Sequence, residues 1–373
     1  MKLRLNLLLL TAAAGVLLAN DRAHTYASNS ACKACHPVIY EEYTASQHNN
    51  STVFKDPIHA AVWKNHPKNL KMKQYGCGKC HTPAADNLDA MLTKGQTALP
   101  DPENATQNDG IACAYCHRIK SIEHHAATNT NVIDPQEKRY YGTLRSHIES
   151  PYHAIATEGN EHMANGNVCI GCHSHKKNKW GLNVCSTNIA NELDGANCVG
   201  CHMPQVEGSV SVMNETKSHA FHGFPGSHAH GEMLAQYIDL SLVRNIDNFI
   251  VNIDNRTSHA LLLHPLRRAV LKVRVERGGK TIEMPEEIFV RVIGKDGKPA
   301  MPWAADSEVL NTMIRHNEKR AVAYDFKLQK GDRVEAVLGY HLVNPQVVGK
   351  LGLSGDKAAT ELHLLKTEIF TVR

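Results

Sequence analysis

Ten of the eleven cysteines fall into five copies of one short pattern, Cys-x-x-Cys-His. Two thiols at this spacing can add to the two vinyl groups of one porphyrin, and the histidine that follows can bind the iron from one face. The pattern therefore predicts five covalently attached c-type haems. The predicted attachment cysteines and proximal histidines are Cys32, Cys35 and His36; Cys77, Cys80 and His81; Cys113, Cys116 and His117; Cys169, Cys172 and His173; and Cys198, Cys201 and His202.

Two other uses of these cysteines compete with haem attachment. Paired Cys-x-x-Cys units can bind zinc, and an even set of cysteines in a secreted protein can form disulfides. Neither use explains why a histidine follows every second cysteine. Cys185 is left over, and a small buried side chain without a chemical role is the simplest interpretation of it.

The five motifs lie close together in the chain, all within residues 32–202. So short a segment cannot wrap each haem separately, so the porphyrins must pack against one another and supply much of the core. The chain has only 7 Phe and 3 Trp among 373 residues, which agrees with a core filled by something other than side chains.

The chain has 24 histidines, and the 19 outside the five motifs are the candidates for the second iron ligands. Five distal ligands are needed if every iron is six-coordinate, so the chain has more candidate histidines than distal positions to fill. A surface or hydrogen-bonding imidazole is the alternative for each candidate. The favoured distal ligands are His48, His153 and His219, followed by His59 and His124; the lower-ranked candidates include His66, His125, His147, His222, His228 and His230.

The composition and hydrophobic pattern of the chain change after His230, beyond which there is no cysteine and β-branched residues alternate with polar ones. We expect a signal peptide over 1–19, a cytochrome domain over 20–231 and a β domain over 232–373. The fold class is then an α and loop multihaem domain with little regular sheet, followed by an all-β immunoglobulin-like sandwich. The predicted elements are a helix over 38–48 and another over 183–194, strands over 249–253, 269–275, 288–293, 321–328, 334–338 and 362–372, and turns at 278–279 and 296–297.

His259 and His264 stand near the start of this second half and could reach back to a haem. A structural imidazole is the more common role for such a residue.

The amino terminus predicts the compartment. Lys2 and Arg4 precede the apolar run 7–18, which is typical of a secretory signal peptide and too short for a membrane span. We therefore expect a periplasmic or extracellular protein without stable membrane insertion. Loss of Lys2 and Arg4 lowers the formal charge of +4, and the haem propionates lower it further, so the charge favours no nucleic-acid partner.

The residues around the motifs resemble those of multihaem cytochromes c related to the tetrahaem electron carrier of ammonia oxidisers, a group that shares haem packing with hydroxylamine oxidoreductases and pentahaem nitrite reductases. The second half looks like a β domain often appended to such proteins. The segments that carry the resemblance are 32–48, with Cys-Lys-Ala-Cys-His-Pro and Ser46-Gln47-His48; Ser150-Pro151-Tyr152-His153; Cys198 to Pro204; Ser218-His219-Ala220-Phe221-His222-Gly223; and Asn255 to Arg267.

The resemblance implies that His48, His153 and His219 are distal ligands and that the haems stack in alternating parallel and perpendicular pairs. Two departures qualify it. All five motifs end in histidine, whereas the pentahaem nitrite reductases carry a catalytic Cys-x-x-Cys-Lys, and Ser258 replaces the usual glycine before His259.

These features favour a secreted pentahaem cytochrome that carries electrons between a redox donor and an acceptor. An enzyme with one five-coordinate haem acting on nitrite, hydroxylamine or sulfite is the first alternative. A subunit of an extracellular cytochrome filament, or another homo-oligomer, is the second. The residues alone favour electron transfer over catalysis without excluding either alternative.

Overall fold

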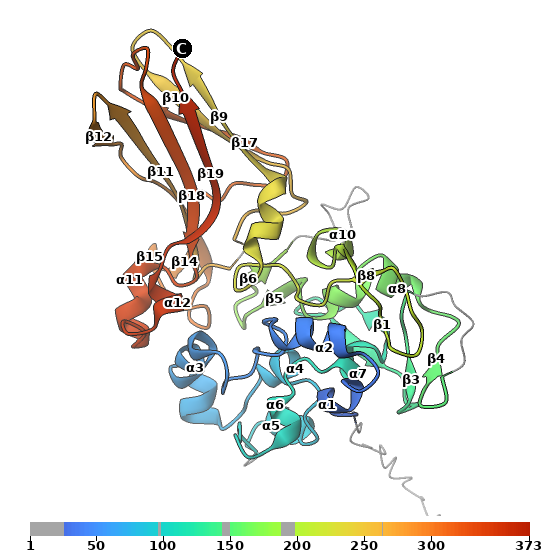
Figure 1. Ribbon diagram of the computed structural model, residues 1–373. Coiled ribbons are helices and arrows are strands. Elements are labelled where there is room, and N and C mark those ends of the chain that lie inside the picture. Colours follow the sequence, from blue (N-terminus) through green and yellow to red (C-terminus); the bar gives the residue numbers. More distant parts are fainter. Residues whose placement is uncertain (1–25, 96–97, 144–149, 188–197, 263) are drawn as a thin grey trace, which may run out of the picture.

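The computed structural model describes residues 26–95, 98–143, 150–187, 198–262 and 264–373. Figure 1 shows a first part of short helices and loops, coloured blue to green, beside an elongated strand-rich part coloured yellow to red. The predicted signal peptide over 1–19 and the candidate ligand His147 lie outside the described residues. No helix among the described residues is long and apolar enough to span a membrane.

The first part contains short elements only. Its helices are α1 (Asn29–Cys32), α2 (Pro37–Thr44), α3 (Pro57–Lys64), η1 (Lys68–Met72), α4 (Gly78–His81), α5 (Leu88–Leu92), α6 (Ala105–Asn108), α7 (Cys113–Cys116), α8 (Glu161–Ala164), η2 (Asn167–Gly171) and α10 (Cys198–His202). Its strands form small two-stranded pairs: β1 (Ile119–Glu123) with β2 (Thr130–Ile133), β3 (Arg139–Tyr140) with β4 (Ala154–Ile155), β5 (His175–Lys177) with β6 (Asn183–Ser186), and β7 (Gln205–Glu207) with β8 (Ser218–Ala220). The expectation of little regular sheet in this part is confirmed.

Local sequence explains where the two longest of these helices begin. Pro37 occupies the first turn of α2, where a missing N–H costs nothing. The Asp56 carboxylate accepts the backbone N–H groups of Ile58 and His59 at the start of α3. The helix predicted over 38–48 ends earlier, at Thr44, because the chain turns there.

Each attachment motif forms a single helical turn. In the first four motifs the backbone N–H of the histidine donates to the carbonyl of the first cysteine, which is four residues earlier. Residues three and four apart lie on one face of such a turn. Both cysteines and the histidine of one motif can therefore meet the same flat group.

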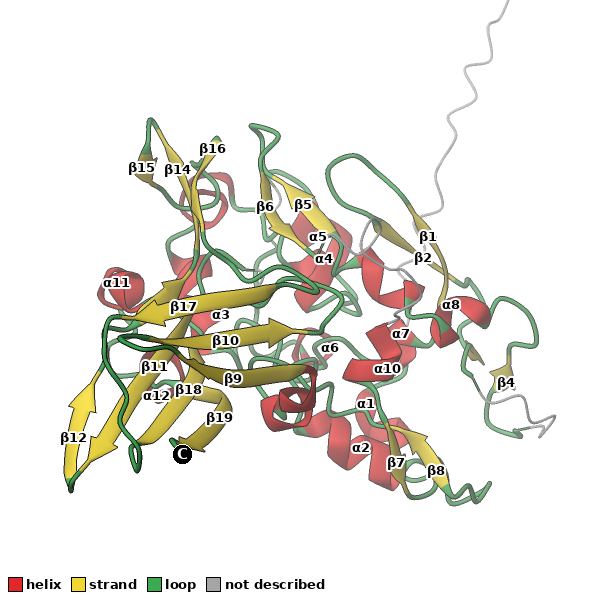
Figure 2. Cartoon of the chain, turned by 90° about the horizontal axis from the view of Figure 1, so that it is seen from above, coloured by secondary structure: helices red, strands yellow, loops and turns green. Residues whose placement is uncertain are grey.

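The strand-rich part contains two main antiparallel sheets. The three-stranded sheet has the order β17 (Lys319–Tyr324), β10 (Phe249–Asn255), β9 (Ile238–Arg244). The larger sheet has the order β12 (Lys280–Glu283), β11 (Arg268–Arg277), β18 (Arg333–His341), β19 (His363–Thr371), with β13 (Glu287–Phe289) also paired to β11. A small third sheet joins β15 (Lys298–Pro299), β14 (Arg291–Lys295) and β16 (Ser307–Asn311). Figure 2 shows β17, β10 and β9 lying over β11, β18 and β19.

One hydrophobic core is shared by the two main sheets. Val251 and Ile253 of β10 are fully buried in it, together with Leu271 of β11 and Val334 and Leu338 of β18. The alternating burial along β10 is the pattern of a strand with one face on a core. This pattern is why the strand-rich character of residues 238–373 was predictable.

Most of the predicted strands and both turns are confirmed. The strand predicted over 288–293 is divided into β13 and β14, and β9 was not predicted. Gly278 and Gly279 both have positive φ in the turn between β11 and β12, as a tight hairpin of this twist requires. The helix predicted over 183–194 is wrong at its start, where residues 183–186 form β6, and residues 188–197 lie outside the described chain. The immunoglobulin-like form and the boundary at 231/232 remain predictions.

Side-chain hydrogen bonds join the first part to the strand-rich part. Asn178, in the β5–β6 turn, donates to the carbonyls of Pro302 and Ala305 at 2.8 and 2.6 Å. Tyr340 of β18 donates to Ser227 O at 2.8 Å. The remaining elements are η3 (Gly231–Tyr237), α11 (Pro345–Val348), η4 (Gly349–Leu351) and α12 (Lys357–Thr360).

Candidate haem and iron-ligand sites

The proximal histidines are held in the tautomer that a metal ligand needs. In four of the five motifs the ring Nδ1 lies close to a backbone carbonyl oxygen. A carbonyl can only accept, so Nδ1–H donates and Nε2 keeps a free electron pair for iron. The bonds are His36 to Val210 O at 2.7 Å, His81 to Ser51 O at 2.9 Å, His117 to Tyr141 O at 2.6 Å and His202 to Pro225 O at 2.6 Å.

Three proximal histidines face a second histidine at the distance an iron would require. Two imidazoles bound to one ion through nitrogens about 2.0–2.1 Å away place their ring centres roughly 6 Å apart. The facing pairs and their ring-centre distances are His48 and His173 at 6.0 Å, His117 and His222 at 6.2 Å, and His202 and His259 at 6.0 Å. These residues fit a bis-histidine haem at the third, fourth and fifth motifs.

Burial keeps these imidazoles neutral. It lowers the pKa of His48 and of His222 to about 3, with smaller contributions from neighbouring histidines. Burial likewise lowers the pKa of His117, His173 and His202. Only the unprotonated nitrogen can bind a metal, so the environment favours the ligand form.

Cysteines of different motifs lie next to one another. Hydrogen bonding between such thiols lowers the pKa of one partner and raises that of the other. The pairs are Cys32 with Cys113, Cys80 with Cys172, and Cys198 with Cys169. The first motif therefore adjoins the third, and the fourth adjoins both the second and the fifth.

The second motif has a different arrangement. His59 of α3 lies with its ring centre 4.1 Å from that of His81, and both rings donate from Nδ1 to Ser51 O at 2.9 Å. The Tyr75 hydroxyl lies 3.2 Å from His59 Nε2. The structure thus brings His59 to the second motif, as a distal ligand would be, but closer than an iron between the two rings allows.

His219 is brought to a carboxylate instead of a proximal histidine. Its Nε2 lies 2.8 Å from Glu42 Oε1, and its Nδ1 lies 3.1 Å from Gly208 O. Both ring nitrogens therefore lie at protein oxygen atoms, Gly208 O and Glu42 Oε1, and not opposite a motif histidine. His222, three residues later and ranked lower from the sequence, is the residue that faces His117.

Two other favoured candidates are placed differently. His153 packs edge-on against Tyr140, and its Nδ1 is buried without a hydrogen-bond partner among the described residues. His124 is exposed at the end of β1. Neither ring belongs to the histidine pairs with centres about 6 Å apart described above. Their role as distal ligands stays a prediction.

The hydrogen bonds of His66 and His264 also determine which of their ring nitrogens carries the proton. His66 Nδ1 accepts the backbone N–H of Lys68 at 3.0 Å, and His264 Nδ1 accepts that of Leu266 at 3.1 Å. The proton then lies on Nε2 in each ring, which removes the electron pair that haem iron would use. The structural role that the sequence favours for His264 stays a prediction.

All eleven cysteines are free thiols, with no disulfide. Among the residues that the structure describes, no three His, Cys, Asp or Glu side chains cluster as a metal site of their own. The zinc and disulfide alternatives thus gain no support from the geometry. Burial raises the pKa of the Cys185 thiol, which agrees with an inert side chain.

Comparison with known proteins points the same way. Residues 31–118 match the family model described as cytochrome c554 and c-prime. The fold is similar to the crystal structure of a penta-heme cytochrome c552 from Thermochromatium tepidum, with a TM-score of 0.75 and 20% identity over 93% of this chain and 99% of that chain.

Weaker matches to superoxide reductases carry no argument. An oxidised superoxide reductase matches at TM-score 0.21 with 9% identity over 36% of this chain and 86% of that chain. The reduced neelaredoxin of Archaeoglobus fulgidus matches at TM-score 0.21 with 11% identity over 36% of this chain and 89% of that chain. No curated protein matches the chain in sequence.

The family model thus covers residues 31–118, and the solved structure shares its fold with nearly the whole chain.

Proposed function

We propose that this chain is a secreted pentahaem c-type cytochrome that carries electrons between a redox donor and an acceptor. The single observation that carries the proposal is the set of histidine pairs with ring centres 6.0 to 6.2 Å apart, each containing one proximal histidine. Haem supplies one-electron redox chemistry when bound. An iron with both faces taken by histidine has no open position for a substrate, which favours transfer over catalysis.

The chain's own residues do three things in this proposal. The ten motif cysteines bind the porphyrins covalently, and backbone carbonyls orient four of the five proximal histidines. His48 of the first part is the distal ligand opposite His173, and His222 is the distal ligand opposite His117. Backbone orientation of this kind fixes ligand geometry and tunes the metal.

Adjacent attachment sites support a continuous carrier. The neighbouring thiols link the first motif to the third, and the fourth to the second and the fifth. The Asn131 side chain contacts the Tyr115 hydroxyl of the third motif at 2.9 Å and Cys172 Sγ of the fourth at 3.7 Å, so these two motifs are also neighbours. All five sites thus belong to one connected group, with the fourth motif as its branch point.

The experiment is a low-temperature electron paramagnetic resonance spectrum of the oxidised holoprotein, integrated against a pyridine-haemochrome count. We expect five haems, all low-spin. A high-spin fraction near one iron in five would overturn the carrier assignment. The protein would then be screened as an enzyme acting on nitrite, hydroxylamine or sulfite. The first candidate for the open iron would be that of the second motif, because the His59 and His81 rings lie closer than an iron between them allows.

The finer features of the protein belong to the same proposal. We place it in the periplasm or outside the cell, with residues 1–19 removed, and treat residues 232–373 as an immunoglobulin-like sandwich. The shared core of the two main sheets supports the sandwich form. A filament in negative-stain images at working concentration would favour the extracellular-filament alternative, and a clean monomer in light scattering would count against it.

A further inference from the structure

His259 is contributed by the strand-rich part, although all five attachment motifs belong to the first part. It lies in the loop that follows β10, and its ring faces that of His202 at 6.0 Å with the two planes 16° apart. We propose that His259 is the distal ligand of the haem attached at Cys198 and Cys201, and that Asn255 positions it. This inference rests on the proposed function, because it assumes a haem at the fifth motif.

The tautomer of His259 suits this role. Its Nδ1 lies 2.9 Å from the carbonyl oxygen of Ala260 and must donate to it, which leaves Nε2 unprotonated. His202 is oriented in the same manner by Pro225 O at 2.6 Å. In both rings Nδ1 donates to a backbone carbonyl and Nε2 is left unprotonated.

Asn255 at the end of β10 holds the His259 loop. Its side chain is fully buried. Nδ2 donates to the carbonyls of His259 at 3.1 Å and Arg315 at 2.8 Å, while Oδ1 accepts the Thr257 backbone N–H at 3.1 Å. The Thr257 hydroxyl adds a second bond to His259 O at 2.7 Å. The carbonyl of His259 thus has two donors, which fixes the backbone that carries the ring.

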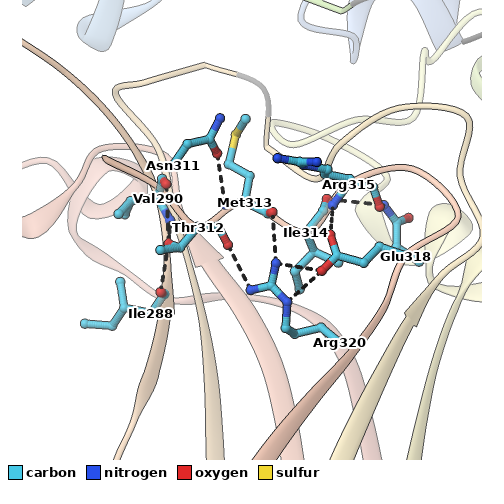
Figure 3. Close-up of polar contacts among 10 residues, drawn as sticks. Ile288, Val290, Asn311, Thr312, Met313, Ile314, Arg315, Glu318 and Arg320 are labelled. Atoms are coloured by element: carbon cyan, nitrogen blue, oxygen red, sulfur yellow. Dashed lines mark hydrogen bonds and ion pairs between the residues drawn. The ribbon is translucent and has the colours of Figure 1, made fainter. Parts of the chain in front are cut away.

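Arg315, which accepts from Asn255, belongs to a segment that further hydrogen bonds hold in place (Figure 3). Arg320 of β17 donates to Thr312 O at 3.2 Å and Met313 O at 3.4 Å, and it pairs with the Glu318 carboxylate at 2.6 Å. Glu318 in turn accepts the Arg315 backbone N–H at 2.7 Å. These bonds hold the Arg315 backbone, whose carbonyl accepts from Asn255 Nδ2, the same amide that donates to His259 O.

A second contact joins the same two regions. The hydroxyl of Tyr237, at the end of η3, hydrogen-bonds Cys201, which raises the pKa of Tyr237. The fifth attachment site is therefore touched by the strand-rich part from two positions, Tyr237 and His259. Ligation by His259 would make the fifth haem a joint between the two parts.

The test compares His259→Gly with the wild type, each as a full-length holoprotein. We expect five haems in both proteins by pyridine haemochrome, but one iron in five high-spin in His259→Gly. Added imidazole should return that iron to low spin, because it replaces the missing ring. The matched control is His363→Ala in β19 of the same part, which should keep all five irons low-spin.

Asn255→Asp tests positioning. It keeps the acceptor for Thr257 but loses the donors to His259 and Arg315, so we expect five haems with altered g-values for one low-spin iron only.

If His259→Gly keeps every iron low-spin, the inference is wrong and the proposed function stands. If the wild type carries fewer than five haems, the proposed function fails first, and the two failures are distinct. Should His259→Gly not fold, His259→Met replaces it, with a raised potential of one haem as the expected result.

Discussion

Glu42 of α2 and His219 of β8 are joined by a side-chain hydrogen bond of 2.8 Å between His219 Nε2 and Glu42 Oε1, and only 14% and 1% of their side chains are exposed. The other carboxylate oxygen of Glu42 accepts the backbone N–H of His222 at 2.9 Å. The Glu42 carboxylate thus binds the ring of His219, which the sequence favoured as a ligand. It also holds the backbone of His222, whose ring faces His117.

This arrangement predicts different effects for two histidines three residues apart. We expect His222→Ala to convert one low-spin iron to high spin, because it removes the ring opposite His117. His219→Ala should leave the spin count unchanged, because both nitrogens of His219 bond to protein acceptors. The measurement is the integrated paramagnetic resonance spectrum of each oxidised variant with its haem count. The reverse result would restore His219 as the ligand and contradict the assignment of His222.

Glu42→Ala should lower the stability of the first part. Removing one partner of a buried pair leaves the other unsatisfied, which costs about 1–3 kcal/mol, and here the His222 N–H also loses its acceptor. We expect a lower Tm in thermal unfolding followed by the haem absorbance. Glu41→Ala, an exposed neighbour on the same helix, is the control and should leave Tm within error.

Haem stoichiometry follows the motifs. Cys172→Ser should lower the haem yield at the fourth motif, because a single thioether remains possible there, whereas Cys185→Ser should retain five haems. Intact-protein mass and pyridine haemochrome together give the count and the number of covalent bonds. A loss of haem in Cys185→Ser would show that this cysteine takes part in attachment.

Acid should weaken the strand-rich part through Asp332. Arg277 hydrogen-bonds both oxygens of this carboxylate, at 2.8 and 2.7 Å, and holds its pKa below the ordinary 3.8. The unfolded chain therefore binds this proton at a higher pH than the folded chain does. The stabilisation is complete well above 3.8 and is lost as the pH falls through the lowered value.

Asp332→Asn should accordingly have a lower Tm than the wild type at neutral pH, with a difference that shrinks below about pH 4. Thermal unfolding followed by circular dichroism from pH 2 to 7 measures this. Asp247→Asn, at an exposed carboxylate, is the control. A difference that stays constant across the range would rule out the charge of Asp332 as the cause.

The parts of the molecule that local pattern specifies were predictable, and the parts that long-range packing specifies were not. Five attachment motifs and the alternating strands β10, β11 and β18 follow from spacing and period alone. The choice between His219 and His222 depends on Glu42, which is 177 residues from His219 in the chain. No local pattern contains that contact.

The helix wrongly predicted from Asn183 had a visible contrary signal. Gly181, with φ of 80°, ends a turn in which the Asn178 side chain accepts the N–H groups of Trp180 and Leu182. Such a turn between two short runs is typical of a hairpin. For His259 the signal was weaker: Asn255 and Thr257 form a tight loop after a strand, but nothing local says that the ring faces His202.

The position of His259 in the chain has a consequence for biogenesis. All five attachment motifs precede residue 203, whereas the loop that faces the fifth motif comes more than fifty residues later. A chain made and exported from its amino terminus therefore presents every attachment cysteine before the segment that would cover the last one exists. We expect maturation to have an order, in which porphyrin is attached to an open precursor and the closing of residues 238–373 over the fifth site is the final step.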